Sequence, residues 1–120
     1  MLLKFLRSKI HGAKVTEANI NYIGSIAIDT QLMEAAGLRT SEIVMVADVE
    51  NGNRLMTYVI PAPAGSKTIC LNGAAARLVS VGDTVLVFSF AYLTEEEAAR
   101  HRARIVLMGE DNEVKEIFDQ

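Results

Sequence analysis

The chain has 120 residues, which is enough for one compact domain with its own core. Half of its residues are hydrophobic, which excludes an intrinsically disordered chain, and a net charge of -3 with thinly spread lysines and arginines excludes a nucleic-acid-binding footprint. The single cysteine, Cys70, excludes an intramolecular disulfide, and its apolar neighbours predict a small buried side chain.

The N-terminal segment and the apolar runs predict where the protein resides. Charges at Lys4, Arg7 and Lys9 interrupt the first residues, so the segment lacks the uninterrupted core of a signal peptide. No apolar run approaches the length of a membrane span. We therefore expect a soluble, cytoplasmic protein that does not associate with membranes.

The first half of the chain predicts short strands joined by tight turns. Asp29 or Thr30 can cap a short helix that Gly37 ends, and Asn51-Gly52 is a strong two-residue hairpin signal. In chain order, the expected elements are a strand at 2–10, an irregular stretch at 15–20 with a turn of helix at 17–19, a strand at 25–28, a helix at 31–36, and strands at 42–50 and 54–60.

The second half continues this pattern. Pro61 and Pro63 are expected to end the preceding strand, because proline cannot donate to a ladder. Thr94 is expected to cap a helix whose first turn is acidic, as the helix dipole favours. The expected elements are a strand at 67–71, a short helix at 72–79, a strand at 84–90, a helix from 94 to about 101 with a solvent-facing His101, a strand at 105–108 and a loose polar tail at 109–120.

Many short strands with brief helices indicate a β-barrel or a β-sandwich. No internal repeat, low-complexity tract or composition change divides the sequence. A single mainly β domain is therefore expected over residues 1–120.

Five short motifs contain most of the polar residues suited to chemistry. Each motif is weak alone, since a Gly-Ser pair, for example, most often forms an ordinary turn. The motifs are Lys9-x-His11, Tyr22-x-Gly24-Ser25, Asn51-Gly52-x-Arg54-x-x-Thr57-Tyr58, Asn72-Gly73-Ala74-Ala75-Ala76 and Val81-Gly82-Asp83.

In this order and at these intervals, the motifs resemble the pyruvoyl-dependent aspartate 1-decarboxylase family, from Lys9 to about Asn112. In that family the protein cuts its own Gly-Ser bond, and the serine becomes an N-terminal pyruvoyl group. The resemblance therefore implies autocatalytic cleavage between Gly24 and Ser25 into a β chain (1–24) and an α chain (25–120). It also implies a six-stranded double-psi β-barrel with short helices, assembled as a homotetramer with active sites between subunits.

The implied activity is decarboxylation of L-aspartate to β-alanine and CO2 for pantothenate, and hence coenzyme A, biosynthesis. The implied cofactor is the pyruvoyl group derived from Ser25, with no metal and no pyridoxal phosphate. A pyruvoyl carbonyl serves as an electron sink, as pyridoxal phosphate does, after the substrate amine condenses on it to form a Schiff base.

The position of Ser25 is consistent with self-cleavage. Its hydroxyl lies next to the Gly24 carbonyl, so the chain itself supplies proximity. Glycine at position 24 permits backbone conformations that other residues resist. Attack converts the amide to an ester, elimination gives dehydroalanine, and hydrolysis with loss of ammonia leaves the pyruvoyl group.

The resemblance implies roles for the remaining motif residues, each of which also has an ordinary structural explanation. Tyr58 is expected to return a proton to the substrate carbanion, although it could be only a half-buried strand aromatic. Thr57 is expected to donate to the Gly24 carbonyl during cleavage, and Asn72, otherwise a helix cap, to stabilise the cleavage intermediate. The residues expected to bind substrate are Lys9, Arg54, Thr57, Gly73, Ala74 and Ala75, and His11 and Tyr22 are expected near the site.

The positive charges of Lys9 and Arg54 support their expected roles in substrate binding. Arg54 can clamp a carboxylate with two hydrogen bonds, and Lys9 offers a second cation for a dianionic substrate, although both could be solvated strand residues. Small residues from Gly73 to Ala75 leave backbone amides free for a carboxylate, or simply pack tightly.

Two other interpretations stay open. The chain could be an unprocessed barrel of the same family that acts as a binding or assembly subunit, or an unrelated small β-domain that binds partners through an apolar surface. Scattered histidines and one cysteine do not predict a metal site, and a triad with His11 lacks a nucleophile elbow. The residues leave open whether Ile26 affects cleavage and whether maturation needs a helper protein.

Overall fold

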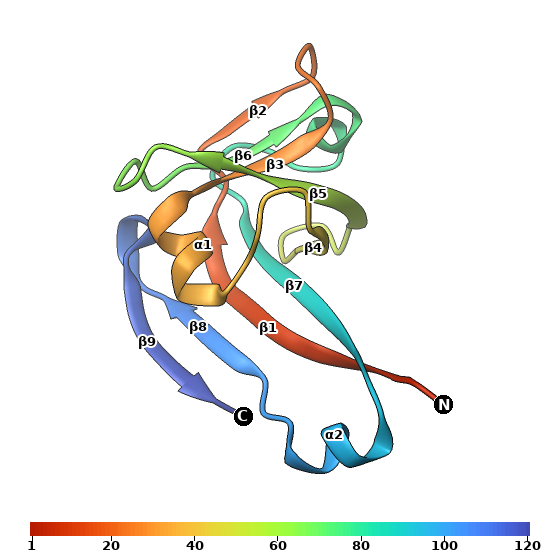
Figure 1. The fold of residues 1–120 in the computed structure, drawn as a ribbon. Coiled ribbons are helices and arrows are strands. Elements are labelled where there is room, and N and C mark those ends of the chain that lie inside the picture. Colours follow the sequence, from red (N-terminus) through yellow and green to blue (C-terminus); the bar gives the residue numbers. More distant parts are fainter.

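The fold consists of nine strands, two α-helices and two short 3-10 helices (Figure 1). It comes from a computed structural model that describes residues 1–120. The strands are β1 (Leu3–Lys14), β2 (Glu17–Asn19), β3 (Ser25–Asp29), β4 (Ile43–Asp48), β5 (Arg54–Ala62), β6 (Ile69–Asn72), β7 (Thr84–Leu93), β8 (Arg104–Met108) and β9 (Val114–Asp119). The helices are α1 (Thr30–Ala36), η1 (Gly73–Arg77), α2 (Glu95–Arg100) and η2 (Glu110–Asn112). None of the helices has the length and apolar character needed to cross a membrane.

The strands pair in the order β2-β6-β3-β5-β4-β7-β1-β8-β9. The pairs β2–β6, β3–β5 and β1–β8 are parallel, and the others are antiparallel. The expectation of a mainly β fold is confirmed, but the expectation of six strands is wrong. The sheet has nine strands, and its end strands β2 and β9 do not pair with each other, so hydrogen bonds do not close it.

Two of these strands have sequences that do not look like strands. Residues 17–19 were expected to form a turn of helix, but they pair with β6 as β2. Residues 114–119 were expected in a loose tail, but they pair with β8 as β9, although all six are exposed. In both cases the partner strand supplies the ladder of hydrogen bonds, so little hydrophobic alternation is needed.

One face of the sheet encloses the core. A cluster of 19 buried residues includes Ile10, Ile26, Val46, Val59 and Val87, which come from five different strands. Burial of each such side chain is worth about 1.5–3 kcal/mol relative to its exposure. This core fixes the strands whose ends form the site described below.

The short helix α1 begins and ends as its sequence predicts. The Asp29 carboxylate accepts hydrogen bonds from the backbone N–H groups of Gln31 (2.8 Å), Gly65 (3.1 Å) and Lys67 (2.8 Å). Burial alone would raise the pKa of Asp29, but these N–H groups outweigh it and lower the pKa. Gly37 ends the helix with a φ of 72°. This cap holds one end of β3, and Ser25 lies at the other end.

The helix α2 lies at the tip of a long extension formed by β1 and β7 (Figure 1). Its predicted capping box is present, since Thr94 and Glu97 bond each other's backbone N–H. The expectation that His101 faces solvent is wrong. Its Nε2 lies 2.7 Å from the Leu6 carbonyl oxygen, and its ring packs edge-on against Phe5.

Candidate active site

The strand pairing places Ser25 beside Asn72. Ser25 begins β3, Asn72 ends β6, and the two are directly opposite in an antiparallel pair. The Asn72 Nδ2 donates to Ser25 Oγ over 3.0 Å, and Ser25 Oγ donates to the Ile23 carbonyl oxygen over 3.1 Å. Because Ser25 is only 1% exposed, its hydroxyl is held by the protein and not by water.

The backbone of Gly24 is pressed against Gly73. A Cβ at Gly73 would lie 2.7 Å from the Gly24 Cα and 2.9 Å from its nitrogen, and Gly73 also has a φ of 68°. At Gly24, by contrast, φ lies outside the left-handed region, and a Cβ would approach nothing closer than 3.8 Å. Gly24 therefore does not adopt a conformation that only glycine reaches freely, and Gly73 is the position that requires glycine.

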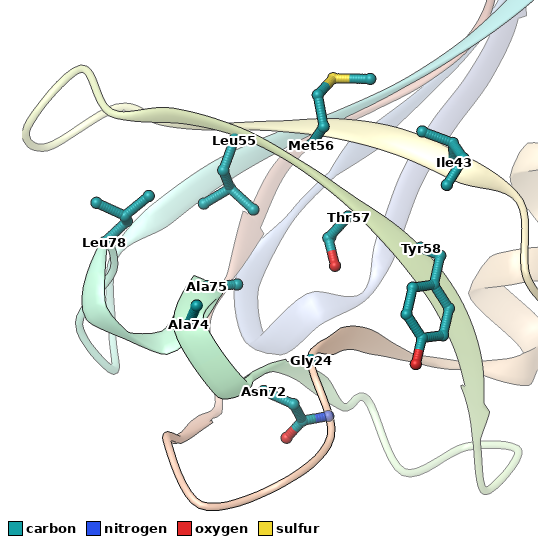
Figure 2. Close-up of a pocket in the computed structure, with 10 residues that line it drawn as sticks. All are labelled: Gly24, Ile43, Leu55, Met56, Thr57, Tyr58, Asn72, Ala74, Ala75 and Leu78. Carbon is teal, nitrogen blue, oxygen red and sulfur yellow. The ribbon is translucent and has the colours of Figure 1, made fainter.

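A cavity of about 480 Å³ opens beside Gly24 (Figure 2). This volume falls in the usual range for small-molecule sites. Figure 2 shows Thr57 and Tyr58 of β5 extending into the cavity, with the Thr57 hydroxyl directed toward the side where Gly24 lies. The lining residues are Gly24, Ile43, Leu55, Met56, Thr57, Tyr58, Asn72, Ala74, Ala75 and Leu78. None of them is charged.

The structure brings together most of the residues that the sequence places near the cleavage bond. Thr57, Tyr58 and Asn72 line the cavity, as do Ala74 and Ala75. Ser25 and Gly73 do not line it but contact residues that do, Ser25 through its hydrogen bond with Asn72 and Gly73 through its close approach to Gly24. The Tyr22 carbonyl oxygen is also close, 3.1 Å from where a Cβ at Gly73 would lie, but the Tyr22 side chain is exposed.

Three predicted residues lie elsewhere, on the solvent side of the sheet. Lys9 is in register with Phe88, Met45 and Met56 across β1, β7, β4 and β5, and His11 is in register with Leu86, Ala47 and Arg54 across the same strands. Side chains of residues in register share one face of a sheet. We call these eight residues the outer face: Lys9, His11, Met45, Ala47, Arg54, Met56, Leu86 and Phe88.

The two cations of the outer face make no ion pair within the chain. The Lys9 Nζ lies 6.0 Å from the centre of the Phe88 ring, and Arg54 is exposed. Arg54, Met56 and Tyr58 alternate along β5 and so share a face, which makes the outer face continuous with the cavity.

His11 is not a third cation at neutral pH. Burial, with a smaller effect from the charge of Lys9, lowers the pKa of His11 below its usual value of 6.5. Its Nδ1 is buried without a hydrogen-bond partner. His11 therefore contributes a neutral, incompletely bonded imidazole to the outer face.

Sequence reasoning missed two groups that contact the site. The Ile23 carbonyl oxygen accepts a hydrogen bond from the Ser25 hydroxyl, and the Cys70 Sγ donates a hydrogen bond to the Asn72 Oδ1 over 3.2 Å. Cys70 is buried as expected. Its spacing of two residues from Asn72 on a strand was the signal that the two side chains share a face.

Comparisons show which known proteins the chain is similar to. The family model described as aspartate decarboxylase matches residues 1–115. The chain is 51% identical over 120 residues to the aspartate 1-decarboxylase of Caldicellulosiruptor bescii, covering 100% of this chain and 94% of that one. It is 52% identical over 117 residues to the aspartate 1-decarboxylase of Clostridium beijerinckii, covering 98% and 94%. Among solved structures, it is similar to the computationally designed protein msDPBB_sym2, with a TM-score of 0.45 and 19% identity over 72% of this chain and 99% of that one.

Proposed function

Because the chain belongs to the aspartate decarboxylase family, we propose that it is an enzyme that decarboxylates L-aspartate to β-alanine and CO2. The product feeds pantothenate biosynthesis. The observation that carries the proposal is the buried contact between Ser25 and Asn72, beside the Gly24–Ser25 peptide bond and beneath the cavity.

The first chemical step is cleavage of the chain by its own serine. The Ser25 oxygen attacks the carbonyl carbon of Gly24, the peptide C–N bond breaks, and an ester joins the two residues. The Asn72 amide donates to the attacking oxygen. The Thr57 hydroxyl, which lines the same cavity as Gly24, is proposed to donate to the Gly24 carbonyl oxygen as negative charge develops there. The Ser25 Cα then loses its proton as the Gly24 carboxylate leaves, and water replaces the nitrogen, which departs as ammonia.

The residues around Ser25 fit the pyruvoyl group that this cleavage would leave. A small ketone would replace a small hydroxyl in a site with neutral hydrogen-bond donors and no charged lining residue. The group supplies an electron sink for the carboxylate that leaves as CO2. We propose that Tyr58, which lines the same cavity, gives a proton to the substrate carbon.

Substrate binding requires positive charge that this cavity lacks. L-aspartate carries two carboxylates, and the two candidate cations, Lys9 and Arg54, lie on the outer face. We infer that a second copy of the chain brings them to the cavity of the first, in a homotetramer with active sites between subunits. Ile43 and Met56 support this assembly, because both line the cavity while each is 56% exposed.

The finer fold that we propose is the double-psi β-barrel of the family. Three parallel strand pairs are mixed with five antiparallel pairs around a single core cluster. Such mixed pairing is the arrangement that crossed connections around one core produce.

Intact-mass analysis after warm incubation tests the cleavage. The wild type should give residues 1–24 and residues 25–120, the latter lighter by one ammonia than a chain that starts with serine. Ser25→Ala should stay intact and form no β-alanine from aspartate. A wild-type chain that stays uncut, with or without cell extract, would instead favour an unprocessed binding or assembly subunit.

A further inference from the structure

A chain of hydrogen bonds links Cys70 to the serine that is cut. The Cys70 Sγ donates to the Asn72 Oδ1 over 3.2 Å, and the Asn72 Nδ2 donates to the Ser25 Oγ over 3.0 Å. The three residues are 5%, 4% and 1% exposed, so water does not compete for these groups. Cys70 lies opposite Ala27 and Asn72 opposite Ser25 in the β3–β6 pair, which places all the side chains in this chain of bonds on one face.

We propose that Cys70 is a positioning residue for cleavage of the Gly24–Ser25 bond, because its thiol proton fixes the orientation of the Asn72 amide. The proposal rests on the proposed self-cleavage at Ser25. A side-chain amide presents an acceptor oxygen and a donor NH2 group at nearly equivalent positions. The thiol donor selects the orientation in which the oxygen faces Cys70 and the NH2 group faces Ser25.

The orientation of the amide decides whether it helps or opposes the attack. With Nδ2 toward Ser25, an N–H stabilises the serine oxygen as it loses its proton and gains negative charge. In the flipped orientation, the amide oxygen would face that negative charge and repel it. The flipped amide would also bring its NH2 group to the thiol sulfur, which is a weak acceptor.

The surroundings of Cys70 keep it a donor. Burial, followed by hydrogen bonding with the Glu17 carboxylate and by the charge of that carboxylate, raises the pKa of the Cys70 thiol to about 11. The thiol therefore stays protonated at neutral pH, and it is a poor nucleophile because the thiolate is the reactive form. A hydrogen-bond donor is the role that remains for it.

The test compares first-order cleavage rates of purified, uncut protein by intact mass at neutral pH. Cys70→Ala should slow cleavage about tenfold, the factor that one neutral hydrogen bond can contribute. Cys70→Val, which fills the space without a donor, should be equally slow. Cys70→Ser, which restores a donor, should cleave at close to the wild-type rate.

A double-mutant cycle separates positioning from packing. If Cys70 acts through Asn72, then Cys70→Ala should have no further effect in an Asn72→Ala background. Additive slowing in the double variant, or a Cys70→Ser rate as low as that of Cys70→Val, would overturn the positioning role. Cys70→Ala and Cys70→Val rates equal to wild type would overturn it while leaving self-cleavage intact, whereas an uncut wild type would overturn self-cleavage itself.

Discussion

At the scale of single residues, the tightest constraint of the site lies at Gly73 and not at Gly24. Gly73 combines a left-handed backbone with contact against the backbone of Gly24. Gly52, in the β4–β5 turn, has a similar φ of 77° but nothing within 4 Å of the place where a Cβ would be. Comparing substitutions at Gly73 and Gly52 therefore separates two costs of adding a side chain: that of the left-handed backbone conformation and that of the close contact with Gly24.

Gly73→Ala should therefore destabilise the protein more than Gly52→Ala. We expect about 1–2 kcal/mol for the left-handed conformation at either position, and about 1–3 kcal/mol more at Gly73 for overpacking. Urea unfolding of uncut Ser25→Ala protein carrying each substitution measures this difference without interference from cleavage. Equal losses at the two positions would show that the contact with Gly24 relaxes at no cost.

Thr57 and Tyr58 are neighbours in the cavity but should affect different steps. Thr57→Val removes the proposed donor to the Gly24 carbonyl, so cleavage should slow by about 10²–10³, the usual value of one oxyanion donor. Tyr58→Phe keeps the ring and loses the acid, so it should cleave normally and form little β-alanine per cut chain. Gels give the cut fraction and a β-alanine assay gives turnover; a Tyr58→Phe variant that turns over normally once cut would remove Tyr58 as the acid.

At the scale of elements, three carboxylates join the β4–β5 hairpin to the turn before β7. Asp48 accepts from the Glu50 backbone N–H, Glu50 from that of Thr84, and Asp83 from that of Ser80. Side-chain oxygens of the three acids lie within 4.8 Å of one another, and Oδ2 of the buried Asp48 lacks a partner. Burial, followed by contact with Asp83, raises the pKa of Asp48, whereas the bond with Asp48 lowers the pKa of Asp83. The site therefore disfavours the charged form of Asp48 and favours the charged form of Asp83.

Asp48→Asn should stabilise the protein increasingly as pH rises. A raised pKa in the folded state means that the folded protein holds the Asp48 proton at pH values where the unfolded chain, with a pKa of about 3.9, has lost it. Stability from this group is therefore complete below about pH 4 and is lost as pH rises through the folded pKa, whereas an asparagine N–H cannot titrate. Urea unfolding midpoints from pH 4 to 8 measure the gap in stability between Asp48→Asn and wild type.

Glu50→Gln is the control for this prediction, since the Glu50 side chain is exposed, and its gap should stay small throughout. A constant gap in stability between Asp48→Asn and wild type at all pH values would contradict a raised pKa of Asp48. Stabilisation of the wild type alone by added Ca²⁺ would assign the site to a cation instead.

Most elements could be predicted because local signals specify them. The caps of α1 and α2 depend on short-range hydrogen bonds that the sequence predicts directly. The hairpin between β4 and β5 is also present, but the expectation of a two-residue turn at Asn51-Gly52 is wrong, because Ala47 pairs with Arg54 and the loop is longer. The strands β2 and β9 could not be predicted, since their sequences lack alternation and their ladders come from distant partners. Likewise β5 continues through Pro61 to Ala62, because it pairs there with β3 in a parallel ladder.

The candidate site was predictable in part because local sequence motifs identify some of its residues. Motif spacing identified Ser25, Thr57, Tyr58 and Asn72, which the structure gathers at one cavity. The bond from Cys70 to Asn72 depends on a side-chain geometry that no motif encodes.

At the scale of the whole molecule, the cavity and the outer face divide the proposed site between two places on one chain. If a site takes Ser25 from one subunit and Arg54 from its neighbour, two inactive variants should complement each other. Co-expressed Ser25→Ala and Arg54→Ala subunits should then recover about one quarter of the wild-type activity, the share of sites that draw both intact residues by chance in a symmetric assembly. The measurement is β-alanine formation by the purified mixed oligomer.

The matched control pairs Ser25→Ala with Tyr58→Phe. Both of these residues belong to the cavity of one chain, so no mixed site would contain both intact, and activity should stay absent. Recovery in the control but not in the test pair would place Arg54 and Ser25 in the same subunit. Sedimentation of the wild type as a monomer at micromolar concentration would contradict the assembly altogether.

The position of β1 within the sheet determines whether folding or cleavage has to come first. Residues 1–24 contain β1, a strand of 12 residues that pairs with β7 along its length and with β8 from Ser8 to His11, and β2, which pairs with β6. A cut after Gly24 would therefore turn an interior strand into a separate peptide that only non-covalent pairing retains. After the cut, refolding would require residues 1–24 to associate with residues 25–120, so its rate would fall with dilution. The intact precursor can fold in one molecule, so folding has to come first and the cut last, and a denatured mature enzyme loses a route that its precursor had.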